Sequence, residues 1–325
     1  MPRDIPEWEA VLNAEIKDIT PLNDAVTHLS IGKNSHIYRC MLWENFYIWA
    51  NRIGDRHLPF GESPGYRYAT INYCLSGRCE VYLSHDTYIY MEPGMICISC
   101  NEPMDGYHYP TGEYTGLELA FDLDALRDHS PQALSDYGQF STWIETLLQE
   151  GNGSHLAYVN EDCHKLITTC FQSLQQAEHT MEDHRFHTLT LLYHLMHGAM
   201  TPYSKAVYVT KGQRMIISEI EQRITQDLSK HIPVTTLARD YGISASSVKA
   251  YFEKVYGQPI SHYLKEQRIE YAKRLLSETT WKVSEIAASC GYSHQGKFGE
   301  VFREATGSTP LEYRRLNYKA KEKNE

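Results

Sequence analysis

The sequence contains little cysteine and no long apolar run. Eight cysteines in 325 residues are too few for the disulfide scaffold of a small secreted protein. No stretch approaches the 18 or more apolar residues of a membrane helix, and no basic and then apolar N-terminal segment precedes a cleavage site of small residues. We therefore expect a cytoplasmic protein with free thiols and without a membrane partner.

The cysteines also give little support for a metal site. Cys97 and Cys100 lie three residues apart in an extended run, so their side chains should point to opposite sides of a sheet. Cys163 and Cys170 share one face of an expected helix, but two thiols without further ligands do not make a zinc site. We predict no metal and no other cofactor.

Charge is distributed unevenly along the chain, whose net charge is −10. Residues 1–213 hold 13 basic and 27 acidic side chains, whereas residues 214–325 hold 18 and 14. The length suits two domains, and a basic end on an acidic chain indicates a nucleic-acid-binding module at the C-terminus.

Short strands dominate residues 37–122, where β-branched and aromatic residues alternate with polar ones between turns rich in Gly, Pro and Asp. Many short strands of this kind predict a sandwich or a barrel. The order of turn, strand, Pro93-Gly94 and strand resembles the small jelly-roll barrel of the cupins.

A helical period replaces the alternation after Pro131. One helix should begin at Asn160 or Glu161 and run to Leu174, and another should cover 184–200. Their apolar faces would be covered either by the barrel or by the same helices of a second subunit. Residues 201–212 have no clear period and serve as a linker, so we expect domains at 1–210 and 211–325.

Two stretches near the C-terminus repeat one pattern. The first contains Val234, Leu237, Ala238, Tyr241, Gly242, Val248, Phe252 and Gly257. The second contains Val283, Ile286, Ala287, Cys290, Gly291, Phe298, Phe302 and Gly307. The offset is 49 residues for the first five pairs and 50 for the last three, which indicates a duplicated unit. Each copy is expected to be a helix-turn-helix, at 234–256 and 283–305, whose second helix can enter a DNA major groove.

Three further helices complete this predicted all-helical domain: 213–229, 261–276 and one that starts at Thr309. Thr309, Pro310 and Glu312 form a well-defined helix start, and Ser261 is expected to cap the connecting helix. Arg268 lies on the same face of that helix as Leu264, so we expect it to form a structural ion pair rather than a phosphate contact.

The motifs of this domain resemble those of the AraC/XylS family of bacterial transcription regulators. The resemblance covers residues 213–316 and rests above all on the string Ile286-Ala-Ala-Ser-Cys-Gly-Tyr-Ser, followed by Phe298, Phe302-Arg303, Gly307-Ser-Thr-Pro310 and Tyr313-Arg314. It implies a DNA-binding regulator with an N-terminal domain that senses a small molecule and forms a homodimer. Double-stranded DNA is the implied partner, and RNA polymerase is a further candidate.

The side chains left for DNA are those on the outer face of each recognition helix, because Val248, Phe252, Phe298 and Phe302 must face the core. The predicted DNA-binding residues are Ala245, Ser246, Lys249, Ala250, Gln295, Gly296, Lys297, Gly299, Glu300 and Arg303. Ser246, Lys249 and Gln295 are the expected base readers, and Lys297 and Arg303 the expected phosphate contacts. Glu300 could accept from a cytosine amino group or hold a neighbouring Arg, and the two glycines weaken the second helix by about 1 kcal/mol each.

The barrel offers a concave apolar site for a small-molecule effector, and we expect Arg67, Tyr73 and His108 to contact it. A metal-dependent cupin enzyme is disfavoured, because its ligands would have to come from the scattered His57, His85, His108 and Glu118, and because no His-x-His pair occurs. We therefore predict a regulator and not an enzyme. The remaining alternative is a regulator that works without a ligand or is controlled by a protein partner.

Overall fold

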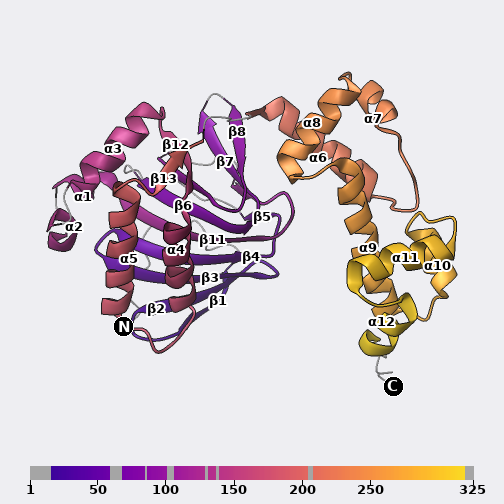
Figure 1. The fold of residues 1–325 in the computed structure, drawn as a ribbon, viewed down its shortest axis with the longest axis horizontal. Helices are drawn as coiled ribbons and strands as arrows, with labels where there is room; N and C mark the ends of the chain where they lie inside the picture. Colours follow the sequence, from indigo (N-terminus) through magenta and orange to yellow (C-terminus); the bar gives the residue numbers. More distant parts are fainter. Residues whose placement is uncertain are drawn as a thin grey trace. The chain divides into compact units, whose positions relative to one another are not determined.

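The computed structural model separates into two compact units, Met1–Thr210 and Lys211–Glu325. The structure describes residues 16–58, 68–84, 86–100, 106–128, 131–136, 139–203 and 208–318. Strands fill most of the first unit and helices the second (Figure 1).

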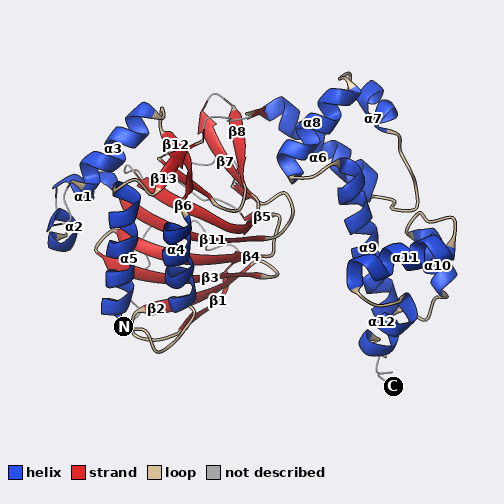
Figure 2. Ribbon diagram, viewed as in Figure 1, coloured by secondary structure: helices blue, strands red, loops and turns tan. Residues whose placement is uncertain are grey.

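A nine-stranded antiparallel sheet is the centre of the first unit (Figure 2). Its strands lie in the order β1-β2-β3-β4-β11-β6-β9-β12-β13. Their bounds are β1 Ile16–Pro21, β2 Val26–Ile31, β3 Ser35–Trp43, β4 Phe46–Ile53, β6 Tyr68–Gly77, β9 Met95–Ser99, β11 Tyr114–Asp122, β12 Ser154–Val159 and β13 Met200–Pro202. Four of these, β1, β2, β12 and β13, lie outside the range in which strands were expected.

Two small sheets complete the strands of this unit. One pairs β5, His57–Leu58, with β10, Tyr107–His108, and the other has the order β14-β8-β7. The bounds of the latter are β7 Cys79–Ser84, β8 Thr87–Met91 and β14 Val209–Thr210. The expected architecture of a strand-rich half with trailing helices and then an all-helical half is confirmed, whereas the closing of the strands into a jelly-roll barrel stays a prediction.

The large sheet buries both faces. Along β11, Leu117, Leu119 and Phe121 belong to a helix-side core that continues into the helices of this unit. Ala120 points the other way, into a strand-side core that includes Leu58, Cys79 and Met91 of the small sheets. This alternation follows from the period of two along a strand. It also separates the two cysteines as predicted, because Cys97 lies in the strand-side core and Cys100 packs on the helix-side core.

Five helices follow β11 in the first unit: α1 Leu123–Asp128, α2 Gln132–Asp136, α3 Phe140–Glu150, α4 Glu161–Ser173 and α5 Met181–Met196. Asn160 caps α4 by accepting from the Cys163 amide, as the sequence predicts. Helix α5 begins three residues earlier than predicted, because Thr180 and Asp183 form a capping box there.

Helices α4 and α5 lie side by side on the large sheet (Figure 1). Ile167 and Phe171 of α4 and Leu192 of α5 belong to the helix-side core. Of the two coverings left open by the sequence, packing on the strands of the same chain is therefore the one that buries these apolar faces.

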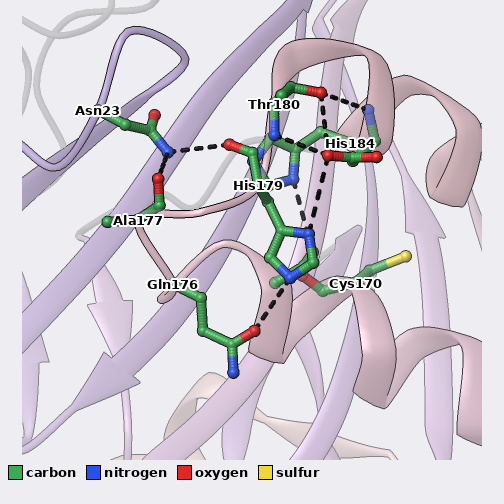
Figure 3. Close-up of polar contacts among 9 residues, drawn as sticks. Asn23, Cys170, Gln176, Ala177, His179, Thr180 and His184 are labelled. Atoms are coloured by element: carbon green, nitrogen blue, oxygen red, sulfur yellow. Dashed lines mark hydrogen bonds and ion pairs between the residues drawn. The ribbon is translucent and has the colours of Figure 1, made fainter.

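The connection between α4 and α5 is tied to the loop between β1 and β2 (Figure 3). The side-chain amide of Asn23 donates to the carbonyl oxygens of Ala177, at 3.2 Å, and His179, at 3.0 Å. His184, which is 2% exposed, lies beneath this connection with its Nδ1 atom 3.5 Å from Ser173 Oγ. The start of α5 is thus fixed to the sheet through Asn23.

The second unit consists of seven helices within the described residues 208–318. They are α6 Lys211–Thr225, α7 Val234–Asp240, α8 Ala245–Tyr256, α9 Ile260–Glu278, α10 Val283–Ser289, α11 Gln295–Thr306 and α12 Pro310–Asn317. Thr309 caps α12 with a capping box to Glu312, as predicted. The predicted Ser261 cap is wrong, because α9 begins at Ile260 after Pro259 and has no side-chain cap.

Across the described residues, we find no helix with the length and apolarity that crossing a membrane requires.

Candidate nucleic-acid interface

Helices α7 and α8 form the first helix-turn-helix. Gly242 in the turn has a φ of +67°, a left-handed conformation that glycine adopts without steric cost. The Ile243 amide donates to the Ala238 carbonyl at 3.0 Å, which closes the turn. Ser244 then caps α8 by accepting from the Ser247 amide at 3.0 Å. The side chain of Ser246 also lies 2.7 Å from Ser244 Oγ, so the first turn of α8 is held in place.

Helices α10 and α11 repeat this arrangement. Gly291 has a φ of +77°, and the Tyr292 amide donates to the Ala287 carbonyl at 2.9 Å. Each partner in this hydrogen bond lies 49 residues after its counterpart in the first motif, so the repeat found in the sequence is a repeat of backbone structure. His294 at the start of α11 makes no side-chain cap, in contrast to Ser244.

The apolar side of each second helix is buried as predicted. Val248 and Phe252 of α8 and Phe298 and Phe302 of α11 are all 0% exposed. The opposite sides are open to solvent: Ser246, Lys249, Ala250, Gln295, Gly296, Lys297, Glu300 and Arg303 are exposed, and Ala245 and Gly299 are partly buried. Their predicted contacts with DNA stay a prediction.

The two outer faces differ in charge. Within the described part of the chain, Lys249 on α8 has no carboxylate within ion-pair distance, so its ammonium group is available to a ligand. On α11 the Nζ atom of Lys297 lies 3.1 Å from Glu300 Oε2. The residue that Glu300 holds is therefore a lysine, not the arginine that the sequence suggested.

Helix α9 joins the two motifs through buried polar contacts. Tyr263 Oη donates to Glu221 Oε1 of α6 at 2.6 Å, and both side chains are buried. One turn later, Arg268 donates from Nε to the Leu228 carbonyl and from Nη2 to the Lys230 carbonyl, each at 3.1 Å. The structural role predicted for Arg268 agrees with these contacts, but its partners are backbone carbonyls and not a carboxylate.

The expected effector residues of the first unit do not lie together. Tyr73 belongs to the helix-side core, where its Oη atom is 2.7 Å from Nδ1 of His164 on α4. Burial raises the pKa of Tyr73 to about 12. His108 lies on β10 opposite His57, with the ring centroids 4.7 Å apart. Arg67 and His85 are outside the described residues.

A buried carboxyl group on the strand side was not singled out from the sequence as an effector contact. Glu118 of β11 is 7% exposed and accepts a hydrogen bond from Asn51 Nδ2 at 3.1 Å. Burial raises its pKa to about 7, which the hydrogen bond from Asn51 opposes. A glutamate at every second position of an otherwise apolar strand is the signal that could have identified it.

The ranges of residues that the structure describes include no group of three or more His, Cys, Asp or Glu side chains placed to hold a metal ion.

Comparison with known proteins concerns the second unit. Residues 237–316 match a family described as a helix-turn-helix domain. The HTH-type transcriptional activator RhaR of Yersinia pseudotuberculosis is 33% identical over 95 residues, which are 29% of this chain and 33% of RhaR. The probable transcriptional regulator LumQ of Photobacterium leiognathi is 31% identical over 103 residues, 32% of this chain and 42% of LumQ. The match thus spans less than half of either relative.

Solved structures show the same limited coverage. A probable AraC family transcriptional regulator from Rhodopseudomonas palustris has 26% identity and a TM-score of 0.30, over 32% of this chain and 99% of its own. The DNA-binding domain of AdpA, solved with a target DNA, has 28% identity and a TM-score of 0.30, over 31% of this chain and 90% of its own. Taken with the motifs and the geometry above, these matches identify residues 237–316 of this chain as an AraC-type helix-turn-helix DNA-binding domain.

Proposed function

We propose that the whole chain is a sequence-specific DNA-binding regulator of transcription. The observation that carries the proposal is the presence, in one compact unit, of two helix-turn-helix motifs whose second helices each bury one side and expose the other. The helices would enter successive major-groove segments on one face of the duplex, about one turn or roughly 34 Å apart. In the cytoplasm of a bacterium, RNA polymerase would be a further partner.

Base reading is assigned to the side chains near the start of each recognition helix. Ser246 and Lys249 would read bases from α8, and Gln295 would read them from α11, where glutamine suits adenine and lysine suits guanine. Lys297 and Arg303 would contact phosphates, which fix the register without reading the sequence.

The first unit would provide sensing and dimer formation. A cupin-like barrel closed by the small sheets would hold a small-molecule effector on the strand side, where Arg67, His108 and the buried Glu118 are the proposed contacts. Tyr73 would then link the sheet to α4 through His164. Phe186 and Tyr193 on α5 are 66% and 46% exposed, and this outer face of α5 is the proposed surface for the second subunit of a homodimer.

Binding of the full chain to DNA tests the proposal. Selection from random duplexes should yield one operator, and its affinity should exceed that for a scrambled duplex. Adding candidate effectors should then change the operator affinity, because an effector acts by binding two states unequally. Equal affinity and equal transcription with every effector, together with full activity of a chain that lacks residues 1–210, would leave a regulator that works without a ligand.

A further inference from the structure

The two recognition helices place opposite charges at the middle of their outer faces. Helix α8 begins at Ala245 and α11 at Gln295, and the buried pairs Val248 with Phe298 and Phe252 with Phe302 keep the same offset of 50 residues. At this offset Lys249 corresponds to Gly299, and Ala250 corresponds to Glu300. The first helix thus presents a cation where the second presents a carboxylate one residue further on.

Glu300 is not needed for the packing of α11. Its side chain is 72% exposed and its partner, Lys297, is 68% exposed, so their ion pair adds little to the stability of the unit. The next glutamate of the helix, Glu304, is held instead by Lys265 of α9 at 3.0 Å. Glu300 is therefore the carboxylate on α11 that contacts only its own outer face.

A carboxylate on a DNA-facing helix restricts the bases that it can meet. Phosphates repel it, and so do the acceptor atoms O6 and N7 of guanine and O4 of thymine. Adenine presents an amino group beside the acceptor N7, whereas cytosine presents its N4 amino group alone, so cytosine is the base that a glutamate suits. The Gly299 neighbour has no side chain that would hold Glu300 away from the groove.

We propose that Glu300 is a specificity-determining residue of the second helix-turn-helix, which selects cytosine at the base that it faces. On binding, Lys297 exchanges the Glu300 carboxylate for a phosphate, and the Glu300 carboxylate accepts from the cytosine amino group. This inference rests on the proposed function and adds to it a base identity that belongs to one residue.

The experiment compares the full chain with its Glu300→Ala, Glu300→Gln and Glu304→Gln variants. The operator selected by the wild type is varied to all four bases at each position, and affinities are measured by fluorescence anisotropy at one salt concentration. The wild type should favour cytosine by about tenfold at one position. Glu300→Ala should lose that preference alone and bind the other bases more tightly, and Glu304→Gln should keep it.

Glu300→Gln distinguishes charge from shape, because glutamine keeps the size and should shift the preference at that position toward adenine. Retention of all wild-type base preferences by Glu300→Ala would overturn the inference while leaving the proposed function intact. A wild-type chain without any sequence preference would overturn both.

Discussion

The Nη2 atom of Arg268 lies 2.7 Å from the point where a Cβ atom at Gly291 would stand. The Leu228 carbonyl oxygen, which accepts a hydrogen bond from the same arginine, lies at the same distance from that point. The Arg268 guanidinium also stands 6.0 Å from the centroid of the Tyr292 ring. One side chain of α9 therefore contacts both the loop that precedes the first motif and the turn of the second.

Substitution of the two turn glycines should have unequal effects. Gly242 and Gly291 have nearly the same φ, so an alanine at either costs about 1–2 kcal/mol for the left-handed backbone. At Gly242 the added Cβ meets nothing within 4 Å, but at Gly291 it meets a backbone carbonyl. Denaturant unfolding should show a larger loss for Gly291→Ala than for Gly242→Ala, and equal losses would contradict the close approach.

Removal of Arg268 should loosen the second motif relative to the first. Arg268→Ala loses two charge-assisted hydrogen bonds to carbonyls, at a cost of about 1.5–3 kcal/mol each before relaxation, and Arg268→Lys cannot make both at once. Operators with one base pair inserted between the two contacted segments provide the measurement. The wild type should bind them weakly, whereas Arg268→Ala should discriminate less between the two spacings; unchanged discrimination would argue against this role.

His184 should make the first unit sensitive to acid. Burial and then the neighbouring His179 and His187 lower its pKa from 6.5 to about 4, against the opposing effect of Asp183. Because the unfolded chain takes up a proton near pH 6.5 and the folded chain does not, the stability contribution is present above pH 6.5 and is lost toward pH 4.

The measurement for His184 is the pH dependence of the melting temperature between pH 7 and pH 4. His184→Leu should flatten it, and His197→Leu, which removes an exposed histidine of the same helix, should not. Equal slopes for both variants would show that another group dominates.

Glu118 should act in the opposite direction. Its pKa is raised from 4.5 to about 7 by burial, so the folded state holds the proton more tightly than the unfolded chain. Stability from this group is complete below pH 4.5 and falls by about 3 kcal/mol as the pH rises to 7. Glu118→Gln should remove this loss, whereas Glu113→Gln, at an exposed position, should leave the pH profile of unfolding unchanged.

The sequence predicted the second unit better than the first, for a physical reason. Helix periodicity is local, so α8 was placed at its observed bounds and α10 within one residue. Strands β12 and β13 depend on pairing with β9 across more than 50 residues, and β1 is exposed along nearly its whole length, so neither carries a periodic signal. The partners of Arg268 were missed because backbone carbonyls leave no trace in the pattern of side chains.

The central claim is that two recognition helices read separate segments of one DNA site. The most direct measurement is the affinity of the full chain, Lys249→Ala and Gln295→Ala for the selected operator and for each of its single-base variants at fixed salt. We predict that each substitution costs about 1–3 kcal/mol at its own base positions, in two segments one helical turn apart. Losses spread evenly over all sequences, or loss at the same position for both variants, would contradict the claim.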